Sequence, residues 1–200
     1  MDLKEVVRKR MSSSTEEKMK QHFETRTNMH IGLVNKYLGK IAALNLPEID
    51  NNKLVFDSHD ASKFKEPEYT PYLHVNWKYR MKDLGEEYTP SREILDSMAE
   101  ATFHHVKNNM HHPEFWDGSW TLDKDAHKPD RDSPALEMVD ATKMPLTHVA
   151  QMVADWLAMS EEKKTFTKDW ADRNVNVRWR FNQEQVDLIY RIIEIFGENS

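Results

Sequence analysis

The chain has 200 residues and a formal net charge of −6, so it is long enough for one buried core and lacks the basic surface that duplex nucleic acid requires. The absence of cysteine excludes disulfides, zinc–thiolate sites, cysteine-ligated iron–sulfur clusters and thiol nucleophiles, and it leaves ten His, with Asp and Glu, as the strong metal ligands. Because there is no apolar run of ~18 residues and no signal-peptide pattern, we expect a cytoplasmic protein that binds no membrane. The length predicts one domain over residues 1–200, and the lack of a Gly-rich phosphate loop argues against a Rossmann or P-loop enzyme.

The first predicted helix has a histidine on its apolar face. Ser12 to Thr15, followed by two glutamates, look like a capping box and predict a helix start there. Apolar or face-aligned residues then recur at alternating steps of four and three: Phe23, Thr27, His30, Val34, Tyr37, Ile41 and Leu44. Pro47 ends the helix. His30 is therefore either a hydrogen-bonded core histidine or a metal ligand.

A short second helix is expected to begin near Asp57 and to stop before the prolines that follow. It carries His59 and Asp60, which supply a nitrogen and an oxygen ligand able to share one divalent metal. Lys63, one helical turn after Asp60, would lie on the same side. A metal site beside a cation suits a phosphate-ester substrate. The alternative is an ordinary surface helix start with Asp57 as its cap.

The next two predicted helices have different kinds of side chain. Residues 72–84 are aromatic and basic and predict a helix that packs its aromatic side chains on the core, or less readily a wall facing a substrate. Thr89-Pro90 predicts the start of the following helix, and Pro113 its end after His112. One face of that helix would present Ile94, Met98, Ala101, His105 and His112, with His104 and His111 as a neighbouring pair. Four histidines on one helix favour a metal role over a polar cluster or a chance run.

A buried carboxylate is predicted near residue 155. Residues 113–132 lack periodicity and predict either a functional lid or a disordered segment, and Ser133-Pro134 predicts a short helix through Asp140. Residues 146–159 then form a helix that is apolar on nearly every side and contains Asp155. A buried carboxylate needs a partner, which would be a metal ion or an arginine such as Arg173 or Arg178. Asp140 is the competing carboxylate.

The C-terminal part is expected to be structural. Residues 161–180 are charged, with Phe166, Trp170 and Trp179 as predicted anchors. Asn182 then caps a last amphipathic helix that ends at Gly197. Its buried face would consist of Val186, Ile189, Tyr190, Ile193 and Phe196.

Taken in chain order, the candidate metal ligands form a pattern that is similar to that of a known superfamily. They are His30, His59, Asp60, His105, His112 and Asp155. This order resembles the HD-domain superfamily of metal-dependent hydrolases, and Lys63 matches the His-Asp-x-x-Lys extension common in it. Over roughly residues 25–160, the segments 59–64, 104–114 and 153–156 look most like a small HD-like family of bacteria and phages. One difference is that better-known two-metal members draw their extra histidines from separate elements, whereas here one helix is predicted to carry them.

The resemblance implies a fold and a ligand set. The fold would be an all-α, HD-like helical bundle with the metal site in its centre, a metal-site core over about residues 25–160 and a packing helix over about residues 182–197. The resemblance also implies that His30, His59, Asp60 and Asp155 hold one divalent ion, with Asp60 bridging to a second held by His105 and His112. His104 and His111 are the alternatives within the cluster. Mn, Mg, Co, Fe and Zn are the candidate ions.

The function that this site would serve is hydrolysis of a phosphate ester, with a nucleotide as the small-molecule substrate. Asp60 would orient or deprotonate a metal-activated water, and Lys63 would offset charge building on the phosphate. Two alternatives stay open at this point: an HD-fold di-iron oxygenase, and a non-catalytic nucleotide-binding protein. A homo-oligomer is also possible.

Overall fold

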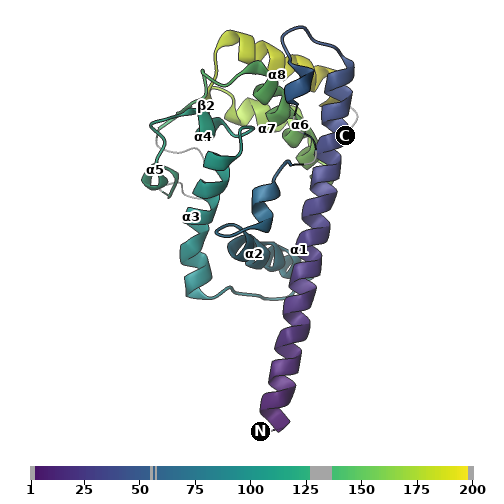
Figure 1. Cartoon of the computed structure of the whole chain (residues 1–200), viewed down its shortest axis with the longest axis vertical. Helices are drawn as coiled ribbons and strands as arrows, with labels where there is room; N and C mark the ends of the chain where they lie inside the picture. Colours follow the sequence, from purple (N-terminus) through teal and green to yellow (C-terminus); the bar gives the residue numbers. More distant parts are fainter. Residues whose placement is uncertain (1–2, 55, 57, 127–136, 198–200) are drawn as a thin grey trace.

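A long helix organises the molecule (Figure 1). The structure, a computed structural model, describes residues 3–54, 56, 58–126 and 137–197. Helix α1 (Leu3–Ala43) runs the length of the molecule, and α2 (Tyr69–Asp83) and α6 (Leu146–Lys163) both pack against it. Helix α3 (Arg92–Asn108) packs on α2, and α8 (Gln183–Phe196) packs on α6. The predicted all-α fold class is confirmed.

Shorter elements connect these helices. They are the 3-10 helices η1 (Asn51–Lys53) and η2 (Ala61–Phe64), the helices α4 (Pro113–Trp116), α5 (Leu122–Ala126) and α7 (Thr167–Asn174), and the strands β1 (Val139–Asp140) and β2 (Trp179–Arg180). The two strands pair in parallel, with Val139 opposite Trp179. Among the residues described, none of the helices has both the length and the apolar character that a membrane span needs.

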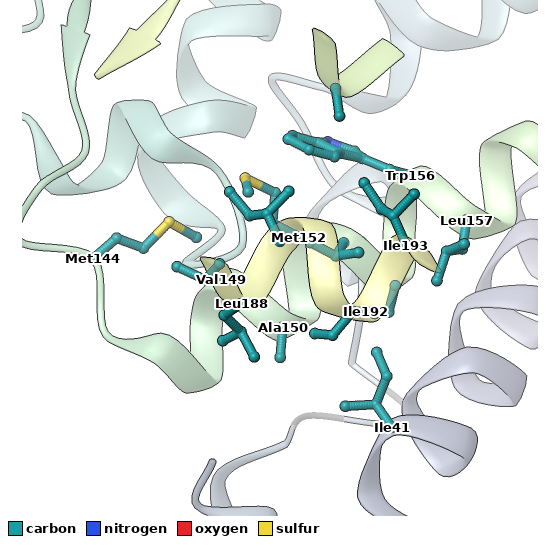
Figure 2. Packing of buried hydrophobic residues seen from close by; sticks show 14 of the residues in the cluster. Ile41, Met144, Val149, Ala150, Met152, Trp156, Leu157, Leu188, Ile192 and Ile193 are labelled. Carbon is teal, nitrogen blue, oxygen red and sulfur yellow. The ribbon is translucent and has the colours of Figure 1, made fainter. Parts of the chain in front are cut away.

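The larger apolar cluster lies between α6, α8 and the C-terminal half of α1 (Figure 2). Val149, Leu157 and Ile189 are fully buried there, as the apolar pattern of residues 146–159 and 182–197 predicts. The α8 start is also as predicted, because the Asn182 side chain accepts from the backbone N–H of Gln185 and the Gln185 side chain accepts from that of Asn182. Burial of these side chains supplies most of the stability at roughly 25 cal/mol per Å² of apolar surface.

A second, smaller apolar cluster joins the N-terminal part of α1 to α2. It contains Phe23 of α1 and Trp77 of α2. Val34, three turns along α1 from Phe23, belongs instead to the larger cluster. His30 lies between them on the same buried face and is itself buried. The α1 stripe therefore passes through two apolar regions with a polar centre between them.

Two helix starts differ from the predictions. Helix α1 already begins at Leu3, so the predicted start at Ser12–Thr15 is wrong. A cap signal is a weak preference, and the strong helix formers on both sides of it carry the helix through. The helix predicted over residues 72–84 already begins at Tyr69, as α2. Pro71 is accommodated because it stands in the first turn, where a helix has no use for its missing N–H.

Four further predictions on secondary structure are wrong. Residue 57, where a helix is expected to begin, lies outside the described residues, and the chain that is described after it turns at Asp60 into the 3-10 helix η2 rather than into an α-helix. Helix α3 starts after its cap Ser91 rather than at Thr89-Pro90. The segment after Pro113 is not uniformly irregular, since it forms α4 and α5. Asp140 lies in β1, and the rest of the helix predicted from Ser133-Pro134 falls mostly outside the described residues. Of the predicted anchors, Trp179 is buried but Phe166 is 65% exposed.

Candidate metal centre

Asp60 stands at the centre of the polar region, in a strained turn. Its φ of 57° is in the left-handed region, which costs a residue other than glycine on the order of 1 kcal/mol and which Asp tolerates better than most. The turn leads into η2 and leaves both His59 and Asp60 buried. Strain of this kind persists where the surroundings hold it in place, and here they direct the two oxygens of one carboxylate toward two different groups of side chains.

The first group faces Oδ2 of Asp60. His30 Nε2 lies 3.8 Å and His59 Nε2 3.7 Å from that oxygen. Asp155 Oδ1, from α6, lies 2.9 Å from His30 Nε2 and 3.8 Å from His59 Nε2. Helix α1, the turn before η2 and helix α6 thus bring together the four predicted ligands of the first ion.

The second group faces Oδ1 of Asp60. His105 Nε2 lies 3.3 Å and His111 Nε2 3.5 Å from that oxygen. His112 Nε2 lies 3.1 Å from His105 Nε2. One ligand atom from each of Asp60, His105, His111 and His112 can be chosen so that all lie within 4.8 Å of one another. Both predicted ligands, His105 and His112, are in this group, and His111 joins them.

These spacings fit metal ligands. Atoms held about 2.1 Å from one ion lie about 3.0–3.4 Å apart at right angles or at the corners of a tetrahedron. The separations in the second group, 3.1, 3.3 and 3.5 Å, are close to this range. Those from Asp60 Oδ2 to His30 and His59 in the first group are wider, at 3.8 and 3.7 Å, so these side chains would have to draw together around an ion. Moreover, His59 Nε2, His111 Nε2 and Asp60 Oδ1 are buried without a hydrogen-bond partner among the residues that the structure describes. Buried polar atoms normally have one, so a shared cation would account for all three. The buried His and Asp side chains could therefore hold a metal ion.

Protonation states in the centre also suit metal binding. Burial, followed by the positive field of His59, lowers the pKa of His111 to about 3. Burial likewise lowers the pKa values of His59 and His112. Burial by itself raises the pKa of Asp60, but Lys63 and the neighbouring histidines outweigh it and hold the pKa well below its usual range. The centre thus offers neutral imidazoles and an ionised carboxylate, the forms that bind metals.

The other two histidine ligands, His30 and His105, lie beside carboxylates that raise their pKa values. Burial opposes the charged form of His30, but its hydrogen bond with Asp155 prevails and the pKa is raised. The pKa of Asp155 is lowered in return, despite its burial, because His30 lies beside it. The pKa of His105 is also raised, since the field of Asp60 outweighs the effect of burial. A metal ion would have to displace any proton that these two imidazoles carry.

Lys63 supplies the cation beside the ligands. Its Nζ donates to Oδ2 of Asp60, and its side chain is 22% exposed, whereas the Asp60 side chain is 3% exposed. The predicted proximity of Lys63 to Asp60 is correct, although η2 rather than an α-helix produces it. The ammonium group stands at the edge of the centre and can meet an anion arriving from solvent.

The histidine pair at residues 111 and 112 is not on α3. That helix ends at Asn108, and Pro113 begins α4 rather than ending the preceding helix, so the prediction of four histidines on one helix is wrong. A turn connects the two helices, with the backbone N–H of His112 bonded to the carbonyl of Asn109. The turn lets His111 and His112 point back at His105, which helical spacing alone would not allow.

Two features of the centre could not be located from the sequence. His111, buried beside Asp60, was only an alternative, because helical register favoured His112. Glu68, which is fully buried and bonded to His104 and His105, lies in a Pro-rich stretch with no periodic pattern to mark it. His104 itself faces Glu68 rather than the ligand groups.

The competing partners lie elsewhere. Arg178 lies 3.6 Å from Glu114, and the Arg173 side chain donates to the carbonyl of Asp169 within α7. Asp140 pairs with Arg180 across the small sheet. Asp155 faces His30 and His59 instead, so the alternative of a salt bridge to one of the two arginines is not what the structure shows.

Comparison with known proteins adds one relationship. No curated protein and no solved structure matches the chain. Residues 19–195, a range that includes every side chain of both ligand groups, match a family of unknown function, DUF5662. The match covers most of the 200 residues. The chain therefore belongs to the DUF5662 family.

Proposed function

We propose that the protein is a metal-dependent hydrolase of phosphate esters, with a nucleotide as its substrate class. The observation that carries the proposal is the position of Asp60 between two sets of histidines. Its Oδ2 faces His30 and His59, which Asp155 also contacts, and its Oδ1 faces His105 and His111. The Lys63 ammonium stands beside the same carboxylate. A carboxylate shared by two ligand groups, with a cation at the edge, suits chemistry on an anionic ester.

The resemblance to the HD-domain superfamily gives the proposal further support. The sequence pattern of His, His-Asp, further His and a final Asp corresponds to side chains that converge on one place. His105 belongs to α3 and His111 and His112 to the following turn, so the extra histidines come from separate elements, as in better-known two-metal members.

In this mechanism the side chains would divide the work. A bound divalent ion would lower the pKa of a water from about 15.7 toward about 7 and polarise a phosphoryl oxygen. Asp60 would contact both ligand groups and would thereby orient that water. The Lys63 ammonium, which uses one N–H on Asp60, has two more to donate to the phosphoryl oxygens as charge builds on them.

The test is release of phosphate from a panel of nucleotides by purified protein, with Mn, Mg, Co or Fe supplied separately. We expect turnover with at least one pairing of ion and nucleotide, and its loss in Asp60→Ala. Asp140→Ala is the matched control, because Asp140 bonds Arg180 and Thr142 at the small sheet and should leave turnover unchanged. Wild-type turnover in Asp60→Ala would remove the mechanism.

A second function, an oxygenase with two irons, is favoured by the composition of the second ligand group. Three imidazoles and one carboxylate without sulfur also suit iron. Iron retained through aerobic purification, together with oxygen consumption on addition of substrate, would favour the oxygenase. Colourless protein that releases phosphate when Mn is added would favour the hydrolase.

A further inference from the structure

Glu68 is a fully buried carboxylate next to the second ligand group. It stands just before α2, and its side chain reaches between α3 and η2. Its Oε1 lies 2.7 Å from Nδ1 of His104, and its Oε2 lies 2.8 Å from Nδ1 of His105. The hydroxyl of Ser62 donates to the same Oε2 at 3.0 Å. Three polar groups from two elements therefore converge on one carboxylate.

The charge of Glu68 determines where its neighbours carry their protons. Glu68 is fully buried, and the groups around its two oxygens, His104, His105 and Ser62, are all able to donate, which is the environment of a carboxylate that accepts from each of them. An ionised carboxylate can only accept hydrogen bonds, so Nδ1 of both histidines must be the protonated nitrogen. When His105 is neutral, its Nε2 then keeps a lone pair, and that nitrogen faces Oδ1 of Asp60 at 3.3 Å.

We infer that Glu68 is the positioning residue of the second ion site: it holds His105 in the tautomer and orientation of a metal ligand without touching the ion itself. The inference deepens the proposed function and rests on its two ligand groups. Carboxylates placed behind metal-binding histidines commonly have this role, and their removal weakens metal binding about 10–100-fold.

Glu68 also connects the two chain segments that supply the second site. Ser62 lies two residues after Asp60, and His105 lies on α3. Asn109 reinforces the connection, because its amide donates to the Ser62 hydroxyl at 3.0 Å and to the carbonyl of His105 at 2.8 Å. Glu68 thereby sets the distance between Asp60 Oδ1 and His105 Nε2, which an ion must bridge.

The first ligand group has a different arrangement. Within the described part of the chain, the Nδ1 atom of His30 has no hydrogen-bond partner, and Oε2 of Glu162 lies 3.9 Å away, too far for a direct hydrogen bond. Because Glu68 touches His105 and not His30 or His59, removing it should affect one ion and spare the other. Selectivity between the two ions is what distinguishes positioning from general support of the fold.

The experiment is a cobalt(II) titration of the metal-free full chain, followed by visible absorption and by metal content per chain. Wild type should bind two ions. Glu68→Ala should bind the first with unchanged affinity and the second about 10–100-fold more weakly. Glu68→Gln, which keeps the shape but not the charge, should show the same selectivity with a smaller loss and covers the case in which the alanine variant fails to fold.

Two controls separate the hydrogen bond to His105 from other effects. Glu66→Gln makes the same chemical change two residues away on an exposed carboxylate bonded to Thr70, and should bind both ions normally. His104→Ala removes one partner of Glu68 but leaves the bond to His105, so the second ion should stay. In diamagnetic zinc-loaded protein, nitrogen-15 NMR of His105 should show protonation at Nδ1.

Each outcome has a clear meaning. If the Glu68 variants bind both ions more weakly to the same extent, or bind both as tightly as wild type, the positioning role would be overturned. The ligand groups of the proposed function would be left intact. Wild-type protein that binds no cobalt would overturn both. Two cobalt ions without any phosphate release would contradict the proposed reaction and leave the role of Glu68 standing.

Discussion

Acid should destabilise the metal-free protein through His111, and replacing this residue should remove part of that sensitivity. His111 is 7% exposed, and its neighbours include other imidazoles. No described residue forms a hydrogen bond with its Nε2. Burial, and secondarily the field of His59, lowers its pKa from 6.5 to about 3. The folded protein thus resists protonation of His111, whereas the unfolded chain accepts a proton at an ordinary pKa.

The size of the effect follows from this difference. The folded pKa is the lower one, so the unfolded state binds the extra proton and stability falls as the pH drops from about 6.5 toward about 3. Each pH unit within that window costs about 1.4 kcal/mol for one such group. Between pH 7 and pH 5, His111 alone should therefore lower the free energy of unfolding by about 2 kcal/mol.

Urea unfolding of metal-free wild type and His111→Gln at both pH values measures this directly. His111→Gln changes the stability at pH 7 as well, so the informative quantity is the difference between the two proteins in their loss from pH 7 to pH 5. We expect wild type to lose about 2 kcal/mol more than the variant. Equal losses would refute the reasoning and would mean that His111 is protonated, or exposed to solvent, in the folded protein.

Four further outcomes are expected. Lys63→Met should lower kcat for phosphate release by about 10²–10³-fold with both ions retained, which kinetics and metal content measure together. Asp155→Asn should weaken the binding of the first ion in a cobalt titration, since that carboxylate faces both His30 and His59. Ile189→Ala, at a fully buried position, should cost about 2–5 kcal/mol in urea unfolding. A chelator should lower the melting temperature of the wild type by more than that of Asp155→Asn, measured by calorimetry.

Periodic patterns in the sequence predicted the fold where helices are long and one-sided. The stripe from Phe23 to Ile41 and the buried run at residues 146–159 are helical, and the Asn182 cap stands where the pattern places it. Capping signals led to wrong predictions where the neighbouring residues had a stronger preference for helix. The serines near residue 12 lie inside α1, because their capping tendency is weak beside the helix formers around them.

The candidate site was predictable in composition but not in geometry. Residue types and their order in the chain selected His30, His59, Asp60 and Asp155; the first three converge, and Asp155 contacts both histidines. The turn after Asn108 has no periodicity, so helical register could not indicate that His111 also faces Asp60. Glu68 escaped notice for a related reason. Its importance comes from contacts with side chains about 36 residues away, and no local pattern encodes them.

The position of the centre ties any bound ion to the stability of the fold. Two apolar clusters lie along α1, and the polar residues between them come from α1, the turn before η2, α3 and α6. Among the residues described, buried atoms such as Asp60 Oδ1 and His59 Nε2 have no hydrogen-bond partner, and each such atom costs roughly 1–3 kcal/mol. An ion would remove that penalty in the folded state alone, because the unfolded chain does not bring these ligands together. A change that weakens metal binding should therefore also weaken the packing of α2 and α3 against α1 and α6, and a change that strengthens one should strengthen the other.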